Sequence, residues 1–248
     1  MKSQYVIELE IGRVLGRGGF CVVQDVCSIN LLSEEKSENE DVDPDKSEIT
    51  DELEQERHNM ANDCVREGKG FRYAVKTVQM NSKKPKVFVR GLVDLVAEAR
   101  LLEHIQHPNI IKIRGVASTS PFRPGYPYFV IVDKLHETLS TRLATSWKKR
   151  KPARFALMKR NEKNQDFLVE RLSVAYDVAS AITHIHKKNV VYRDITPNNI
   201  GFDALDDVKI FDFGLSKELH PSLLANDGCY KLTGDCGSLR YMAPGMLT

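Results

Sequence analysis

The sequence contains few cysteines, and their spacing predicts neither a metal site nor a disulfide framework. The five cysteines are odd in number and include no CxxC pair, so we interpret them as reduced thiols of an intracellular protein. No run of about 18 apolar residues is present, which excludes a transmembrane helix. The first ten residues, MKSQYVIELE, lack the apolar core of a secretion signal. The net charge is only +2, which gives the whole chain no electrostatic attraction to nucleic acid or membranes.

The 248 residues suffice for one large domain or two small ones, with an ordinary globular balance of 42% hydrophobic and 28% charged residues. Two charged blocks depart from this average. Residues 30–69 hold 14 acidic and 5 basic side chains and predict a solvated insertion, in which Ser47–Asn62 could form a polar helix. Residues 148–164 hold eight basic and one acidic side chain. Each block is either a surface insertion or a docking site for a partner.

The first half of the chain is predicted to be mostly β with one helix. Alternating and β-branched segments predict strands. These strands are Glu10–Leu15, Phe20–Cys27, Phe71–Gln79, Lys112–Ala117 and Tyr128–Val132. Residues 86–106 predict the helix, because Leu95, Glu98, Leu102 and Ile105 recur at spacings of 3, 4 and 3.

The second half begins with a strongly helical segment, Phe167–His186. It carries two apolar stripes, one of Leu168, Leu172, Ala175, Ala179 and Ile182, and one of Val174, Val178, Ala181 and Ile185. A helix that is apolar on two faces is normally buried, which requires other elements to cover both stripes. Short strands are predicted at Ile200–Phe202 and Val208–Phe211, followed by a long irregular segment.

A glycine-rich segment, LGRGGFCVV at residues 15–23, lies between the first two predicted strands. Glycines allow backbone N–H groups to approach phosphate oxygens without obstruction by a Cβ. The alternative is a tight hairpin turn without a ligand, because short glycine patterns recur by chance.

Lys76 shares a predicted strand face with Ala74 and Val78, so it points towards an apolar cleft. The alternative is a surface lysine whose stem covers apolar surface. Glu98 weakens that alternative, because it lies on the apolar stripe of its helix, where an unpaired carboxylate is costly. A lysine on the facing strand would supply its partner and could then hold a nucleotide phosphate.

Two polar motifs follow the long helix. YRDITPNN at residues 192–199 places Asp194 where it could accept a hydrogen bond from a substrate hydroxyl, and Asn199 where it could bind a divalent cation. In DFG at residues 212–214, Asp212 follows a strand, as suits a Mg²⁺ ion that bridges phosphates. Each motif alone is more often a turn, but all the signals together, in this order, are very improbable by chance.

In these motifs the chain resembles a eukaryotic protein kinase catalytic domain, from about Glu8 to Pro244. Further matches are YAVK (73–76), HPNII (107–111) and GSLRYMAP (237–244). The resemblance implies an α+β, bilobal fold. Residues 1–133 would form a β-rich N-lobe with one regulatory helix, and residues 134–248 a mainly α C-lobe.

The resemblance also implies the role of each matching residue. Gly16 and Gly18 would cover the ATP phosphates, Leu15, Val23 and Ala74 would contact the nucleotide, and Lys76 would bind its phosphates and pair with Glu98. Asp133 to Leu135 would form the hinge after the gatekeeper Val132. Asp194 would be the catalytic base, Asn199 and Asp212 would bind Mg²⁺, and Arg193 would receive an activation-loop phosphate, best placed on Thr233. Leu102, Ile113, Tyr192 and Phe213 would stack into the regulatory spine.

The chain departs from the family pattern at four places. Cys21 replaces the third glycine, and Thr196 replaces the lysine that balances γ-phosphate charge in serine/threonine kinases. Gly201 stands where a bulky apolar residue usually forms the floor of the adenine pocket. Ala243-Pro244-Gly245 replaces Ala-Pro-Glu, and the chain stops three residues later, so we expect an incomplete C-lobe from a fragment or an incomplete gene model. One apolar face of the helix at 168–185 would then have lost its cover.

The sequence thus predicts an ATP- and Mg²⁺-dependent kinase that phosphorylates protein substrates on Ser or Thr, in the cytoplasm or the nucleus. Ser238 supports this preference, since tyrosine kinases typically carry proline there, and GSLRYMAP is also similar to the tyrosine-kinase-like group. One alternative is a nucleotide-binding pseudokinase or an inactive fragment that acts as a scaffold. Another is a nucleic-acid-binding module built on KKRKPAR, which lacks interleaved aromatic residues.

Overall fold

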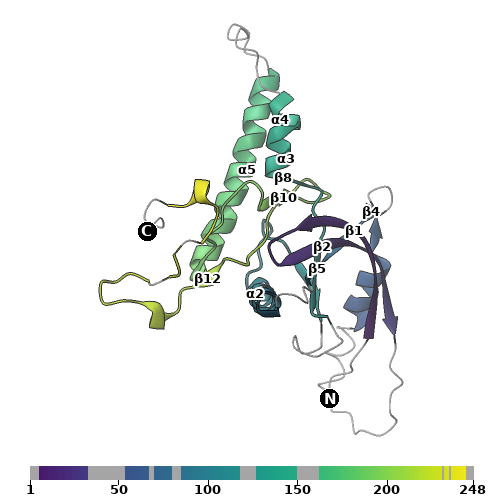
Figure 1. Ribbon diagram of the computed structural model, residues 1–248. Helices are drawn as coiled ribbons and strands as arrows, with labels where there is room; N and C mark the ends of the chain where they lie inside the picture. The colour runs from purple at the N-terminus through teal and green to yellow at the C-terminus, as the bar shows by residue number, and fades with distance from the viewer. Residues whose placement is uncertain are drawn as a thin grey trace. The chain divides into compact units, whose positions relative to one another are not determined.

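A computed structural model describes residues 6–32, 54–66, 70–79, 85–117, 127–149, 162–230, 232–234 and 236–243 (Figure 1). The chain divides into two compact units. The first comprises Met1–Leu95 and Ile113–Lys134, and the second comprises Val96–Lys112 and Leu135–Thr248. Within the described ranges, no helix combines the length and the apolar character needed to cross a membrane.

The first unit is built on a five-stranded antiparallel sheet of order β1-β2-β5-β7-β6. Its strands are β1 (Val6–Arg17), β2 (Cys21–Leu32), β5 (Tyr73–Val78), β6 (Ile113–Val116) and β7 (Phe129–Asp133). All five predicted strands of the first half are confirmed, although β1 and β2 extend further than expected. Strands β1 and β2 form the long hairpin seen in purple in Figure 1.

One face of this sheet carries an apolar cluster that includes Val26, Ile29, Tyr73, Val75 and Ile131. A helix at 54–62 packs Met60 and Ala61 against this cluster, and buried Cys64 follows it. The short hairpin of β3 (Val65–Arg66) and β4 (Gly70–Phe71) comes next. The C-terminal part of the predicted helix Ser47–Asn62 is therefore confirmed, whereas residues 47–53 lie outside the described residues.

The predicted helix of residues 86–106 is α2 (Pro85–His104), and the boundary between the two units falls within it. Its buried residues are Leu92, Leu95, Glu98, Ala99 and Leu102. Their spacings of three and four place them on one face of the helix, as the apolar periodicity predicted.

The second unit combines short helices, one long helix and small sheets. The helices are α3 (Leu139–Ala144), α4 (Ser146–Lys149) and α5 (Glu162–Lys187), with two 3-10 turns, η2 (Pro221–Leu223) and η3 (Leu239–Tyr241). Strands β8 (Glu137–Thr138), β10 (Ile200–Phe202) and β11 (Val208–Ile210) form a sheet of order β11-β10-β8. Strand β9 (Val190–Val191) pairs with β12 (Lys217–Glu218). The basic block lies largely at 150–161, outside the described residues.

Only one of the two apolar stripes predicted on α5 is covered. Val174, Ala181 and Ile185 are buried, as expected for the second stripe. Leu168 and Leu172 of the first stripe are more than half exposed, as expected for a helix that has lost the cover of one of its two apolar faces. The periodicity identified both stripes correctly, but it carries no information about which elements pack against each face.

Candidate active site

Asp194 is held by two hydrogen bonds that fix both carboxylate oxygens. The side-chain amide of Asn199 donates from Nδ2 to Asp194 Oδ2 at 2.7 Å and to the Asp194 carbonyl at 3.1 Å. The backbone N–H of Ser238 donates to Asp194 Oδ1 at 2.9 Å. Three residues that the sequence predicted as functional are therefore brought together. Each carboxylate oxygen keeps lone pairs for a further donor, such as a substrate hydroxyl.

Gly237 allows the segment that carries Ser238 to approach the catalytic loop this closely. Its φ is 113°, a conformation that favours glycine, and a Cβ there would stand 2.6 Å from the carbonyl oxygen of Arg193. No role was predicted for Gly237, although it begins the motif GSLRYMAP. The contact of this segment with Asp194 joins residues 44 positions apart in the chain, so it depends on the tertiary structure and not on the local sequence.

Asn199 and Asp212 lie at the two ends of the β10–β11 hairpin, one residue before β10 and two residues after β11. Because Asn199 Nδ2 donates to Asp194, the amide orientation leaves Oδ1 as its acceptor end. An amide oxygen and a carboxylate are the donor types that Mg²⁺ prefers, so the residues fit this ion. Among the described residues, no cluster of three or more His, Cys, Asp or Glu side chains forms a metal centre. A magnesium ion here would take its remaining ligands from phosphate and water.

Glu98 is buried on α2 and accepts a hydrogen bond at Oε1 from the backbone N–H of Phe213, at 3.3 Å. The Phe213 ring in turn packs edge-on against Tyr192, with ring centroids 4.9 Å apart. The Tyr192 hydroxyl donates to the carbonyl of Phe211. Burial, with the nearby carboxylates of Asp212 and others, raises the pKa of Tyr192, so this hydroxyl stays protonated and continues to donate.

The predicted glycine-rich segment is the turn of the β1–β2 hairpin. Leu15 and Gly16 lie in the last three residues of β1, where Gly16 is paired with Val23 across the hairpin. The N–H of Gly18 donates to the carbonyl of Cys21 at 2.8 Å, which closes the turn. The hairpin turn is therefore confirmed, and the phosphate-binding role of its glycines stays a prediction.

Phe20, at the tip of this turn, packs on α2. A Cβ at Gly91 would stand 2.7 Å from Phe20 Cβ and 3.1 Å from a methyl group of Val78, so Phe20 lies directly on the backbone of the helix. The carbonyl of Phe20 also accepts a hydrogen bond from the N–H of Gln79 at 2.8 Å. The periodicity of α2 placed Gly91 within the helix but gave no reason for a glycine there.

Ala74 and Lys76 lie on β5, the middle strand of the five-stranded sheet, where Ala74 is buried and Lys76 is partly buried. Ala74 pairs with Val132 and Lys76 with Val130 across the β5–β7 ladder. This confirms the strand placement of both. Lys76 and Glu98 belong to different units, and their ion pair stays a prediction.

Two ion pairs hold the predicted hinge segment within the first unit, one through the negative Asp133 and one through the positive Lys134. Arg114 on β6 binds Asp133 through two hydrogen bonds, Nε to Oδ1 and Nη2 to Oδ2, both 2.8 Å long. Lys134 Nζ lies 2.6 Å from Oδ1 of the fully buried Asp25, an ion pair whose geometry falls outside that of a hydrogen bond. Arg13 approaches the other carboxylate oxygen from the surface at 3.2 Å. These pairs could not be expected from the sequence, because their members lie far apart in the chain.

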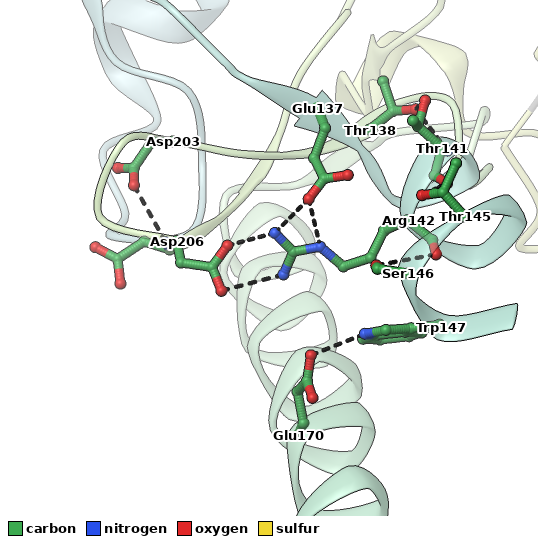
Figure 2. Close-up of polar contacts among 11 residues, drawn as sticks. Glu137, Thr138, Thr141, Arg142, Thr145, Ser146, Trp147, Glu170, Asp203 and Asp206 are labelled. Carbon is green, nitrogen blue, oxygen red and sulfur yellow. Dashed lines mark hydrogen bonds and ion pairs between the residues drawn. The ribbon is translucent and has the colours of Figure 1, made fainter. Parts of the chain in front are cut away.

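Arg142 forms the most extensive polar network of the second unit (Figure 2). From α3 it donates to Glu137 at 2.8 Å and to both carboxylate oxygens of Asp206, in the turn between β10 and β11. Its guanidinium also lies 3.3 Å from the ring centroid of Phe202. Burial acts to lower the pKa of Arg142, but its hydrogen bonds to Asp206 and Glu137 outweigh this and raise it. Arg142 was not recognised in the sequence.

Two of the three substituted positions in the second unit are buried, and the third, Gly245, lies outside the described residues. Thr196 is 3% exposed, and its carbonyl accepts a hydrogen bond from the N–H of Asn199 at 3.0 Å. Gly201 is the middle residue of β10, where Leu135 approaches it. Leu135 itself follows the hinge pair of Asp133 and Lys134 and is partly buried.

Comparison with known proteins identifies this arrangement. Residues 57–248 match the protein kinase domain family. The chain belongs to the protein kinase domain family. It is 28% identical over 219 residues to ribosomal protein S6 kinase alpha-1 of Mus musculus, covering 87% of this chain and 26% of the relative.

Two further relatives give similar values. The chain is 31% identical over 175 residues to ribosomal protein S6 kinase alpha-2 of Mus musculus and to alpha-6 of Homo sapiens, in each case over 71% of this chain. The matched part covers 20% and 19% of these relatives, so the chain spans about a quarter or less of the curated relatives it matches.

The comparisons confirm the protein kinase resemblance and the α+β fold class predicted from the motifs. The family match begins at residue 57, downstream of the glycine-rich turn at residues 15–23. The roles assigned to individual site residues, and the similarity to the tyrosine-kinase-like group, stay predictions.

Proposed function

We propose that this kinase domain transfers the γ-phosphoryl group of ATP to a Ser or Thr hydroxyl of a protein substrate. The substrate oxygen forms the new bond to the γ-phosphorus, the bond from that phosphorus to its bridging oxygen breaks, and ADP leaves. The proton of the hydroxyl goes to Asp194. The observation that carries this proposal is the Asp194 carboxylate, which Asn199 and Ser238 hold from two sides.

The remaining residues position the nucleotide. Lys76 binds the α- and β-phosphates, the backbone from Gly16 to Gly18 covers them, and Leu15, Val23 and Ala74 contact the base. The hinge, Asp133 to Leu135, contacts the base through backbone groups other than the N–H of Lys134, which donates to the carbonyl of Arg72 at 2.9 Å. Asn199 and Asp212 hold Mg²⁺, which neutralises phosphate charge when bound.

The lobe boundaries of 1–133 and 134–248, the docking roles of the two charged blocks and the cytoplasmic or nuclear location belong to the same proposal. The cysteine spacing, which predicts reduced thiols, is compatible with a reducing compartment. Because the relatives are named for ribosomal protein S6, that protein is a suitable first substrate to test.

The proposal is tested by phosphotransfer from Mg²⁺-ATP, with nucleotide binding measured by thermal shift. Asp194→Asn should lower kcat by at least about a hundredfold while it leaves ATP binding in place. Lys76→Met should reduce the ATP-induced shift. A wild-type chain that binds ATP but transfers no phosphate would limit the function to nucleotide binding. Equal shifts in wild type and Lys76→Met would remove the phosphate-binding role of Lys76.

A further inference from the structure

The side-chain space of residue 201 is filled by a residue from another part of the chain. A Cβ at Gly201 would stand 2.7 Å from Leu135 Cδ1, and 3.3 Å from both the Glu137 carbonyl oxygen and Phe211 Cε1. Since Cβ atoms essentially never approach other heavy atoms within 3.0 Å, Leu135 would have to move for any larger residue to fit. The missing side chain is thus replaced by Leu135, with Phe211 at its edge.

The backbone around Leu135 is fixed relative to Gly201 by hydrogen bonds. The N–H of His136, next to Leu135, donates to the carbonyl of Phe202, next to Gly201, at 2.8 Å. Strand β8 continues this pairing, with Thr138 opposite Gly201. Because the two backbones are joined on this side, Leu135 can leave the space at residue 201 only by a rotation of its side chain.

The Arg142 network strengthens this constraint (Figure 2). Arg142 binds Glu137 at the start of β8 and Asp206 in the turn after β10, so it ties together the two strands that meet beside Gly201. Its contact with the buried ring of Phe202 holds the next residue of β10 as well. Separation of β8 from β10 would break the hydrogen bonds of Arg142 to Glu137 and Asp206 and its contact with Phe202 together.

We propose that Leu135 and Phe211 supply the apolar floor beneath the nucleotide base in place of a side chain at residue 201, and that Leu135 determines which bases the site accepts. This inference rests on the proposed ATP-dependent function. Aliphatic and aromatic side chains are the usual lining of a site for a flat heterocycle. In this chain the size of the floor depends on a hinge side chain, and not on a residue of β10.

Four variants test the proposal by steady-state kinetics with ATP and with an ATP analogue that carries an added benzyl group on the base. Leu135→Ala should raise the KM for ATP about tenfold with kcat within about twofold, because it removes apolar contacts to the base alone. It should also accept the enlarged analogue, which the wild type rejects. Gly201→Ala should raise the KM for ATP by displacing Leu135, and Gly201→Ala/Leu135→Ala should bring the KM closer to wild type than either single variant.

Gly115→Ala is the matched control. No atom lies within 4 Å of a Cβ at this glycine on β6, so the KM for ATP should not change. Thermal melting without nucleotide verifies that each variant folds. If Leu135→Ala does not fold, Leu135→Val replaces it, and the KM values for ATP should rank in the same order among the variants.

Three outcomes are decisive. A double variant no better than the worse single variant would overturn the inference while leaving the proposed function intact. If Leu135→Ala lowers kcat but leaves the ratio of the KM for ATP to the KM for the benzyl analogue unchanged, Leu135 only packs the fold and does not select the base. A wild-type chain that binds no Mg²⁺-ATP would overturn the proposed function itself, and this inference with it.

Discussion

Arg193 donates a hydrogen bond to the hydroxyl of Thr233, from Nη1 to Oγ1 at 2.9 Å, across 40 residues of chain. The same nitrogen lies 3.3 Å from the Thr233 carbonyl, and Nε donates to the carbonyl of Leu215 at 2.6 Å. The guanidinium of Arg193, the residue that precedes Asp194, is thus already hydrogen-bonded to the hydroxyl that we predicted as the phosphorylation site.

Phosphorylation of Thr233 should therefore raise activity. A phosphate adds about −1.5 to −2 charges and can form a bidentate pair with Arg193, which would order the segment around it. Thr233→Ala should lower kcat/KM in activated protein by about tenfold or more, the value of one or two charge-assisted hydrogen bonds. Mass spectrometry of the activated protein would locate the phosphate.

Ser222→Ala, in the same segment, is the control for this prediction, because its hydroxyl contacts His220 and no residue of the site. Full activity of Thr233→Ala, or a phosphate found elsewhere in the segment, would contradict the assignment.

The buried pair of Asp25 and Lys134 should contribute strongly to stability. Asp25→Asn leaves the ammonium of Lys134, only 8% exposed, without its counter-charge, and removal of one partner of such a pair costs about 3–5 kcal/mol. Arg13→Gln removes an exposed partner of the same carboxylate and should cost at most about 1 kcal/mol. Urea denaturation of both variants measures the difference.

The double variant Asp25→Asn/Lys134→Met separates the ion pair from simple packing. It should recover most of the loss, because no charge then remains buried. Equal stabilities of Asp25→Asn and Arg13→Gln would show that Lys134 reaches solvent in the folded protein.

The stability of the fold should fall on acidification through His107. Burial lowers its pKa below the ordinary 6.5, and the nearby His184 and Lys209 act in the same direction, although Asp177 opposes them. Because the unfolded chain then binds more protons than the folded one, the free energy of unfolding decreases as the pH falls below about 6.5. Protonation would also remove the Nδ1 acceptor of the Asn109 N–H, which lies at 3.1 Å.

Urea denaturation at about pH 7.5 and about pH 5.5 checks this prediction. His107→Asn should show a smaller loss of stability between the two pH values than the wild type, whereas His186→Asn, at an exposed position on α5, should behave like the wild type. The same pH dependence in all three proteins would exclude His107 as its source.

The helices, strands and loops that depend on the pattern of neighbouring residues could be predicted from the sequence. The strands around Gly16, the strand of Lys76, the helix of Glu98 and the loop of Asp194 lie where periodicity and motif order placed them. These features depend on neighbours a few residues apart, which a single sequence contains. The pairing of Asn199 with Asp194 could also be expected, since the two lie five residues apart on one loop.

Contacts between distant segments could not be predicted in this way. Leu135 in the space at Gly201, Lys134 on Asp25 and Arg142 on Asp206 each join segments more than 60 residues apart. Each side chain alone is compatible with an ordinary surface or core position, and only the folded backbone decides which partner it meets.

The contact between Phe20 and Gly91 has a consequence for sequence variation. Since the ring lies directly on the helix backbone, any side chain at position 91 would collide with it unless position 20 became smaller. The two positions should therefore covary among chains of this kind, with glycine at 91 accompanying a large aromatic residue at 20. A chain with a bulky residue at 91 should carry a small one at the tip of the β1–β2 hairpin.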